Sequence, residues 1–318
     1  MDNERKSLRW GVMLIACAAV LRLLSSGLPG AMIQAFAGEE TVAVLLYLES
    51  GRVVRPAPEE TPALETRPSP TTQPEETLPL LEMGDADLVS VNNDTSLQPD
   101  IPTLMQEAQF PRLQGDEPTV LIVHTHGSES YLAQGGYMES SPFRTYDEGY
   151  NMVSIGSALA EKLRSHGIGV IHDTTLHDVP DYNGAYASSR SSIQKYLEEY
   201  PSIRLVLDLH RDASNDYVNQ LTTAATVSGE SSAQLMLVIG TSHDAWQRNM
   251  SCAVQLHALL EKTWPGLCRA INFRTGRFNQ DLGPVTMLVE VGAAGDTREE
   301  ALIAVNALAD AIIALSGG

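Results

Sequence analysis

The chain contains the stretch Ile203-Arg204-Leu205-Val206-Leu207-Asp208-Leu209-His210-Arg211-Asp212, an apolar run that ends in a histidine and charged side chains. Two more apolar runs end in the same way. Residues 120–123 precede the sequence His124-Thr125-His126, and residues 286–289 precede Glu290-Val291-Gly292. A short apolar run bounded by polar residues is typical of a buried strand. We therefore predict three such strands, each with chemically active side chains at its end.

The three strand ends are expected to meet in one place. In an open α/β sheet the ligand crevice lies beyond the carboxyl ends of the strands, so His126, His210 and Glu290 would be delivered to it. Two histidines, a ligand carboxylate and one further glutamate are the parts of a hydrolytic zinc centre. The pattern therefore predicts metal-assisted amide hydrolysis, with Zn²⁺ as the cofactor.

The first cluster offers two histidines, of which one is expected to bind the metal. His124 and His126 would point to the same side of a continuing strand, whereas a turn at Gly127 lets only one of them reach the metal. His126 lies nearer the turn and is the predicted ligand. His124 is predicted to support the site or to act on the transition state. The alternative interpretation is that both are polar residues at a strand end.

Three carboxylates compete for the remaining ligand position. Glu129 follows His126 by three residues and is the predicted ligand. Asp147 and Glu148 precede a helix expected from residue 151 and are rivals, because a residue at a helix entrance can also face the crevice. Their other interpretation is helix capping or favourable placement near the helix N-terminus.

Glu290 interrupts an apolar sequence, and burial of an ionised carboxylate without a partner is costly. We predict that it is the general base, close to the metal and not bound to it. Arg211 is predicted to contact an anionic substrate group, to pair with Asp212 or to orient His210. His210 has a second interpretation as a core histidine. The other histidines have no partner visible in the sequence and are predicted to be structural, namely His166, His172, His177, His243 and His257.

From about residue 118 strands alternate with helical periodicity, which is typical of a three-layer α/β domain with a mostly parallel or mixed sheet and helices on both faces. Thr297 and Glu300 form a capping box at the start of the last helix. Strands are expected near 118–125, 168–172, 203–209, 234–240, 269–274 and 285–291, and helices near 151–166, 183–200, 244–263 and 297–316.

The N-terminal part has a different composition. Basic residues precede an apolar stretch from residue 10 to 24, so residues 1–30 are predicted to be an uncleaved, single-pass membrane anchor with the remainder outside the cell. A cleaved signal peptide and a lipoprotein site at Cys17 are the alternatives. Residues 31–115 are acidic and rich in proline and are expected to form a disordered extracytoplasmic linker. Residues 116–318 are expected to be the catalytic domain.

Charge and cysteine content exclude some classes of protein. The formal net charge of −19 argues against a nucleic-acid binder, which needs a basic face. Three cysteines do not make a disulfide framework. Cys252 and Cys268 either pair in an oxidising compartment or remain small apolar groups, and the second interpretation is favoured.

Between about residues 118 and 309 the chain resembles the stage II sporulation protein P family, peptidoglycan hydrolases of endospore-forming bacteria related to zinc-dependent N-acetylmuramoyl-L-alanine amidases. The resemblance lies in six segments considered together. They are His124 to His126 with Glu129 to Tyr131, Gly167 to Asp173 with His177 and Asp178, Tyr186 to Arg190, Asp208 to Ala213, Asn279 to Leu282, and Leu288 to Gly292.

The resemblance implies an amidase-like fold in which His126, His210 and a carboxylate bind zinc and Glu290 acts in catalysis. The position of the ligand carboxylate matches the related amidases less well, because those amidases place it further along the chain than Glu129. The resemblance also implies cleavage of the amide that joins the lactyl group of the glycan to the stem peptide, with peptide cross-links as a second target. It further implies a role in wall degradation at the septum during engulfment and a membrane-anchored, glycan-cleaving partner. Two other functions remain open: a cell-wall binding scaffold with a degenerate site, and a metalloprotease-like enzyme acting on proteins.

Overall fold

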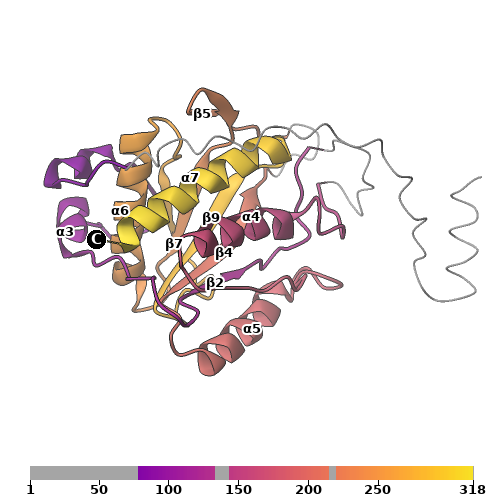
Figure 1. Ribbon diagram of the computed structural model, residues 1–318. Coiled ribbons are helices and arrows are strands. Elements are labelled where there is room, and N and C mark those ends of the chain that lie inside the picture. The colour runs from indigo at the N-terminus through magenta and orange to yellow at the C-terminus, as the bar shows by residue number, and fades with distance from the viewer. Residues whose placement is uncertain (1–77, 133–142, 215–219, 318) are drawn as a thin grey trace, which may run out of the picture. The chain divides into compact units, whose positions relative to one another are not determined.

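The computed structural model describes residues 78–132, 143–214 and 220–317 (Figure 1). The chain divides into two units, Met1–Pro74 and Glu75–Gly318, and every described residue belongs to the second. The predicted anchor at residues 1–30 lies outside the described residues, as does most of the predicted linker. Within the described ranges, none of the helices has the length and apolar character needed to cross a membrane.

The centre of the fold is a seven-stranded sheet with the order β1-β8-β7-β9-β4-β2-β3. All neighbouring strands are parallel except β7 and β9, so the sheet is mixed but mostly parallel, as predicted. The six strands expected from the sequence are confirmed, and a small hairpin of β5 and β6 lies outside the sheet. The strands are β1 (Val91–Asn93), β2 (Val120–Val123), β3 (Val170–His172), β4 (Leu205–Asp212), β5 (Ala225–Val227), β6 (Glu230–Ser232), β7 (Leu235–Gly240), β8 (Ile271–Arg274) and β9 (Val285–Ala293).

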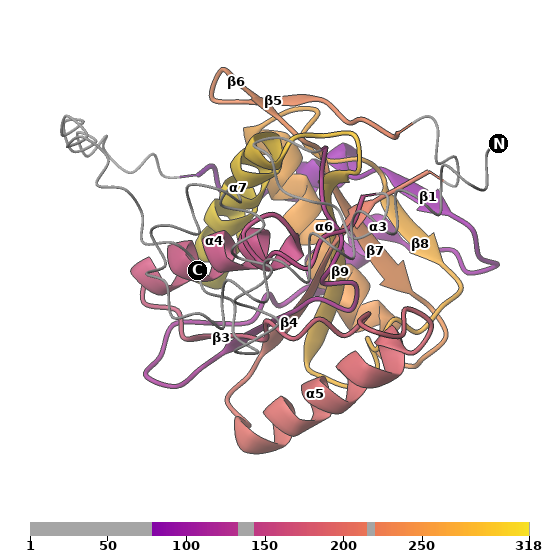
Figure 2. The ribbon, with the colours of Figure 1, turned by 90° about the vertical axis from the view of Figure 1, so that its right-hand side faces the viewer.

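Helices cover both faces of the sheet, which confirms the predicted three layers. On one face lie α4 (Met152–Ser165), α6 (Trp246–Thr263) and α7 (Arg298–Ser316), and on the other lies α5 (Ala185–Glu199) (Figures 1 and 2). Successive side chains of a strand point to opposite faces. Accordingly Ile122 joins the large core beneath α4, α6 and α7, whereas Leu121 packs with Ile193 of α5. The capping box at the start of α7 is present, with Glu300 N donating to Thr297 Oγ1 at 3.2 Å.

The face that carries α5 is only partly covered by that helix. The apolar cluster beneath α5 belongs to β2 and β4. Across the same face, Met236, Val238 and Leu288 form a separate small cluster with Phe278. Strands β7 and β9 therefore present part of this face to a loop and a cavity instead of a helix.

Residues 78–115 were expected to belong to the linker, and the structure instead packs them on the folded unit. Strand β1 extends the sheet, with Val91 opposite Ile271 of β8. A 3-10 helix, η1 (Met83–Leu88), and α3 (Ile101–Glu107) lie against α6, and Leu104 and Met105 are buried. The elements are too short to give a periodic pattern in a proline-rich, acidic sequence, which is why the pattern did not predict them.

The two cysteines of the folded unit do not pair. Cys252 is buried and Cys268 is partly buried, and both are free thiols. The favoured interpretation of these residues as small apolar groups is confirmed.

Candidate metal centre

Strands β4 and β9 place a histidine and a glutamate side by side. The two strands are parallel neighbours, and His210 stands directly opposite Glu290 in their register. Both side chains point to the face that carries α5, as does Asp208, because alternate residues of a strand share a face. The two strand-end clusters predicted from the sequence therefore meet at one edge of this face.

The loop after β2 completes a group of three metal-binding side chains, His126, Glu129 and His210. Each offers a ligand atom, and these atoms lie within 4.8 Å of one another. Glu129 Oε1 is 3.7 Å from His126 Nδ1, and Glu129 Oε2 is 3.5 Å from His210 Nδ1. The structure thus brings together the three residues that the sequence analysis chose as ligands.

Glu129 is fixed by the backbone around it. The Glu129 N–H donates to the carbonyl of His126 across a turn, at 3.1 Å. The Glu129 carbonyl accepts from the N–H of Met152, in the first turn of α4, at 3.0 Å. The side chain is 7% exposed and accepts from Arg211 N at 3.3 Å. Burial raises the pKa of this carboxyl, but Arg211 and the two histidines outweigh it and hold the pKa at about 2. The rival carboxylates, Asp147 and Glu148, are exposed and stand outside the cluster.

A carboxylate lies behind the His210 ring, on the side away from Glu129. His210 Nε2 lies 3.1 Å from Asp208 Oδ1, while Nδ1 faces Glu129. Asp208 in turn accepts from Thr125 N at 2.8 Å and from Thr125 Oγ1 at 2.6 Å. Burial lowers the pKa of His210, but Asp208 and Glu129 reverse this and raise it well above its ordinary value. The surroundings of His210 therefore stabilise positive charge, and Asp208 stands where carboxylates commonly support metal-binding histidines.

Aromatic rings surround His126. Its ring stacks on Tyr182 with centroids 4.4 Å apart, and it meets Tyr186 edge-on at 5.6 Å. Arg144 lies over the outer face of Tyr182, 4.1 Å from the ring centroid, and pairs with Asp178 at 2.9 Å. The sequence analysis did not identify Tyr182, because only the fold brings its loop to the strand ends. Tyr186 was noticed only within one of the segments that carry the family resemblance.

Glu290 has an unusual environment for a carboxylate. Its Oε2 atom is shielded from solvent and has no hydrogen-bond partner within the described residues. Burial raises its pKa to about 8, against the opposing effect of His210. The residue therefore stands beside the cluster with an oxygen available to exchange a proton, in the place predicted for a general base.

These side chains line a cavity of about 750 Å³. The metal-binding group lies at one end, with Arg144, Tyr182 and Tyr186 around it. The other end runs over β7, β8 and β9 and is lined by Met236, Val238, Asn272, Arg274, Phe278 and Leu288. The cavity is thus large enough for a substrate that extends well beyond the reacting bond.

The structure separates His124 from the site. The side chain is fully buried, and it does not line the cavity. Its Nε2 lies 2.9 Å from His172 Nε2, and its Nδ1 lies 3.2 Å from the carbonyl of Leu209. The transition-state role predicted for His124 does not fit this position, since the chain turns between residues 124 and 126. His172, which the sequence left without a partner, is the neighbour of His124.

Arg211 also differs from expectation. Its guanidinium is buried and donates to the carbonyls of Ser130 at 2.9 Å and Phe143 at 2.7 Å. The predicted pair with Asp212 does not form, because Asp212 pairs with Arg269 at 2.7 Å. Arg211 therefore ties the ligand loop to β4 through two carbonyls and neutralises Glu129, 3.9 Å away.

The donor set fits a small divalent cation. Zinc bound at about 2.0–2.1 Å in a tetrahedral arrangement separates its ligand atoms by roughly 3.4 Å, close to the 3.5 and 3.7 Å observed around Glu129. Nitrogen and carboxylate ligands suit this metal, and the shielded, unpartnered Oε2 of Glu290 stands beside them.

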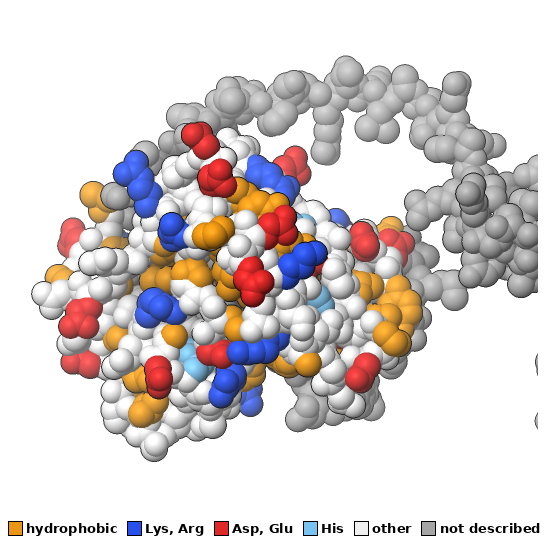
Figure 3. All heavy atoms as spheres, turned by 90° about the horizontal axis from the view of Figure 1, so that it is seen from below, with side chains coloured by type: hydrophobic (Ala, Val, Ile, Leu, Met, Phe, Trp, Pro, Cys, Tyr) orange, Lys and Arg blue, Asp and Glu red, His pale blue; other side chains and the backbone are white. Residues whose placement is uncertain are grey.

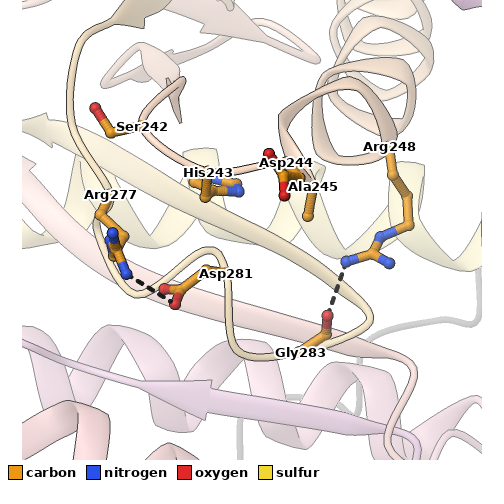
Figure 4. Close-up of a pocket in the computed structure, with 8 residues that line it drawn as sticks. All are labelled: Ser242, His243, Asp244, Ala245, Arg248, Arg277, Asp281 and Gly283. Atoms are coloured by element: carbon orange, nitrogen blue, oxygen red, sulfur yellow. Dashed lines mark hydrogen bonds and ion pairs between the residues drawn. The ribbon is translucent and has the colours of Figure 1, made fainter.

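A second cavity of about 580 Å³ lies at the start of α6, away from this cluster. Its lining includes His243, Asp244, Arg248, Arg277 and Asp281 (Figure 4). The charges there are engaged within the chain, since Arg277 pairs with Asp281 at 3.4 Å and Arg248 donates to the carbonyl of Gly283 at 2.8 Å. It offers no group of metal-binding residues among those that the structure describes.

The fold and the site define an α/β protein with a largely buried His-Glu-His centre suited to a metal. The chain belongs to the stage II sporulation protein P family, whose model matches residues 50–313. It is 31% identical over 209 residues to stage II sporulation protein P of Bacillus subtilis (strain 168). This alignment covers 62% of the chain and 50% of the relative, so the chain spans half the length of that protein.

Two solved structures are similar to the chain at low sequence identity. One is an N-acetylmuramoyl-L-alanine amidase from Clostridium difficile 630, with a TM-score of 0.38 and 14% identity, covering 63% of this chain and 94% of that one. The other is the CwlD amidase from Clostridioides difficile in complex with the GerS lipoprotein, with a TM-score of 0.35 and 11% identity, covering 62% of this chain and 94% of that one.

Proposed function

We propose that this protein is a zinc-dependent peptidoglycan hydrolase, an N-acetylmuramoyl-L-alanine amidase that separates the stem peptide from the glycan. One observation carries the proposal. The group of His126, Glu129 and His210, of which the last two are buried, stands beside a glutamate whose carboxyl oxygen has no partner among the described residues. Membership of the stage II sporulation protein P family supports peptidoglycan as the substrate.

In this proposal His126, Glu129 and His210 hold the zinc ion. When bound, zinc supplies Lewis-acid chemistry, which activates a water molecule and polarises an amide carbonyl. Asp208 keeps the His210 ring in the orientation that turns Nδ1 toward Glu129. Arg211 holds the Glu129 loop in place through the Ser130 carbonyl.

Glu290 performs the proton transfers. It takes a proton from the attacking water as the new C–O bond forms at the amide carbon. It then delivers this proton to the amide nitrogen as the C–N bond breaks, so that the stem peptide leaves as an amine. Burial raises the pKa of Glu290 to about 8, and a cation in the neighbouring cluster lowers it by stabilising the carboxylate. The pKa of Glu290 would thereby lie near the working pH, where the carboxyl group can both accept and release a proton.

We also propose, from the N-terminal sequence, that residues 1–30 anchor the protein in the cell membrane and that the catalytic unit acts outside the cell. A membrane-anchored enzyme that cleaves glycan strands would be its partner, because removal of stem peptides leaves bare glycan for such an enzyme. Fractionation of cells that express the full chain with a C-terminal tag tests the anchor. Recovery in the soluble fraction would contradict it.

The test of the activity uses the full chain, loaded with zinc, on purified peptidoglycan. Mass spectrometry of the released material should show intact stem peptides whose amino terminus has been freed, and a chelator should stop their release. Binding of peptidoglycan without any product would indicate the scaffold, and cleavage of proteins without release of stem peptides would indicate the protease. Fragments cut within the cross-links would add a peptidase activity to the amidase.

A further inference from the structure

The cavity continues from the metal centre across the uncovered part of the sheet. Strand register shows its path, since Glu290 lies opposite Met236, and Leu288, Val238 and Asn272 form the next row across β9, β7 and β8. Residues two apart on a strand share a face, so Arg274 points to the same side as Asn272. All of these residues line the cavity.

This part of the cavity has an apolar floor, formed by β7 and β9, and an apolar wall, formed by Phe278. Met236, Val238 and Leu288 form the floor and are buried, with Phe278 packed on them. A side chain at Gly240 would place its Cβ 2.9 Å from Phe278 Cδ2, so the ring fits only above a glycine. The wall therefore lies close against β7.

The loop that carries Phe278 is held in a conformation that it would not adopt by itself. Phe278 and Asn279 have φ values of 48° and 55°, in the left-handed region that residues other than glycine rarely occupy. Asn279 secures the loop to α5 by donating to the carbonyl of Tyr186 at 2.9 Å and to Ser189 Oγ at 3.1 Å. Strained backbone that the surrounding structure maintains in this way is typical of ligand-binding regions.

The far end of the cavity is polar, and two of its side chains have no partner among the described residues. Asn272 Oδ1 is shielded from solvent and accepts no hydrogen bond from the residues that the structure describes. The Arg274 side chain is exposed, and no ion pair or hydrogen bond of its guanidinium with any described residue is present. The arginines nearer the metal centre are engaged, Arg144 with Asp178 and Arg211 with Ser130 and Phe143. Arg274 is thus available for a ligand.

Arg274 places a positive charge at the end of the cavity away from the metal-binding group. A ligand carboxylate that reaches this end is attracted to its guanidinium. On the side of the molecule where α5 lies, acidic and basic side chains are interspersed (Figure 3), so recognition by Arg274 is a local contact and not the effect of a broad basic surface.

We propose that Asn272 and Arg274 form a subsite for the stem peptide, in which Asn272 accepts a peptide N–H and Arg274 binds a free carboxylate of the peptide. The inference rests on the proposed function and specifies which part of the substrate fills the cavity. Neighbouring strands lie about 4.8 Å apart, so Asn272 is roughly 10 Å across the sheet from β9. An extended peptide covers about 3.4 Å per residue, which puts the bound carboxylate roughly three residues or more beyond the bond that is cut.

The experiment measures steady-state kinetics of the full chain with zinc on two soluble muramoyl peptides of the same sequence, one with free carboxylates and one with amidated carboxylates. Arg274→Gln should raise KM for the free-carboxylate substrate about tenfold with little change in kcat, because a charged hydrogen bond made equally in ground and transition states is lost. KM for the amidated substrate should not change. Arg274→Lys should recover part of the affinity. Asn272→Ala should raise KM for both substrates by a smaller factor.

Arg277→Gln is the matched control. Arg277 is a nearby arginine with a 59% exposed side chain that lines the second cavity, and its loss should leave both substrates unaffected. Equal changes on both substrates for Arg274→Gln, or no change on either, would overturn the subsite. Inactivity of the unaltered chain on both substrates would instead contradict the proposed amidase, so the two failures can be told apart.

Discussion

His124 and His126 stand two positions apart in the sequence, and the fold gives them opposite environments. His126 lines the cavity, faces Glu129 at 3.7 Å and stacks on Tyr182. His124 is fully buried among apolar residues and faces His172 at 2.9 Å. A turn over residues 125–128 separates them. His126 therefore belongs to the metal-binding group, whereas His124 belongs to the core beneath α4.

The pKa of His210, a second member of the metal-binding group, differs in direction from the pKa values of the buried pair. Around the metal centre, Asp208 and Glu129 raise the pKa of His210 well above its ordinary value despite burial. Beneath α4, burial and the neighbouring histidine lower the pKa of His124 to about 3, and burial with Arg164 lowers that of His172 to about 4. Changes in the first region should therefore affect chemistry and metal binding, and changes in the second should affect stability alone.

The largest effect is expected from Glu290→Gln. Glutamine keeps the shape and polarity of the side chain but cannot accept a proton from water. Loss of a general base typically lowers the rate by about 10²–10⁴-fold. Release of stem peptides by the full chain should fall by this factor, while zinc content and thermal unfolding stay as in the unaltered chain. Near-normal turnover with zinc in place would show that Glu290 is structural and would move the search for the base to Glu129.

Glu129→Gln should lose zinc. Its carboxylate is the acidic member of the ligand group, and loss of even a supporting hydrogen bond behind a ligand typically costs about 10–100-fold in metal affinity, so loss of a ligand should cost more. Metal analysis after dialysis measures the effect. Asp147→Asn and Glu148→Gln are the matched controls, because both residues are exposed and outside the cluster. Full zinc retention by Glu129→Gln would remove this residue from the proposed ligands.

The sequence predicted those parts of the fold and site that depend on local pattern. Short apolar runs predicted six strands, three of them ending in polar clusters. Helical periodicity, with the capping box of Thr297 and Glu300, predicted α7 and the helices before it. Because the ligand crevice of an α/β sheet lies at the carboxyl ends of its strands, His210 and Glu290 were expected to lie close together, and their register confirms this.

Features that depend on contacts between distant segments were not visible in the sequence. His172 meets His124 only because β3 pairs with β2, with His172 opposite Ile122. The role of Arg211 depends on two loop carbonyls from other parts of the chain. Strand β1 has only three residues, too few to show a period, and its edge position depends on β8. In each case the deciding information is the tertiary neighbour, which composition and spacing do not encode.

Gly156→Ala should weaken the fold and leave the metal centre intact. Gly156 lies in α4 behind the histidine pair, and a Cβ there would stand 2.5 Å from His124 Nε2 and 2.6 Å from His172 Nε2. Overpacking of a well-filled core typically costs about 1–3 kcal/mol in the free energy of unfolding. Chemical denaturation of the full chain should show this loss, with zinc content unchanged. The matched control is Gly84→Ala, where an added Cβ meets no atom within 4 Å.

The smallest effect concerns the pH dependence of stability, and it isolates the histidine pair. The pKa values of His124 and His172 in the folded protein, about 3 and about 4, lie below the ordinary value of about 6.5 for an unfolded chain. Above pH 6.5 both residues are neutral in both states, so their contribution to stability is fully present. As the pH falls below 6.5 the unfolded chain binds protons that the folded chain does not, and stability is lost progressively until the folded pKa values are reached.

Within that pH window, each of these histidines lowers the free energy of unfolding by at most about 1.4 kcal/mol per unit fall in pH. The measurement is the free energy of unfolding of the zinc-loaded full chain between pH 7 and 5, compared with His172→Gln. Glutamine cannot be protonated, so the variant should lose stability less steeply on acidification, even if it starts lower at pH 7. His166→Gln is the control, because that residue lies at the exposed end of α4. Identical slopes for the unaltered chain and His172→Gln would mean that acid destabilises the protein through other groups and that the histidine pair does not sense pH.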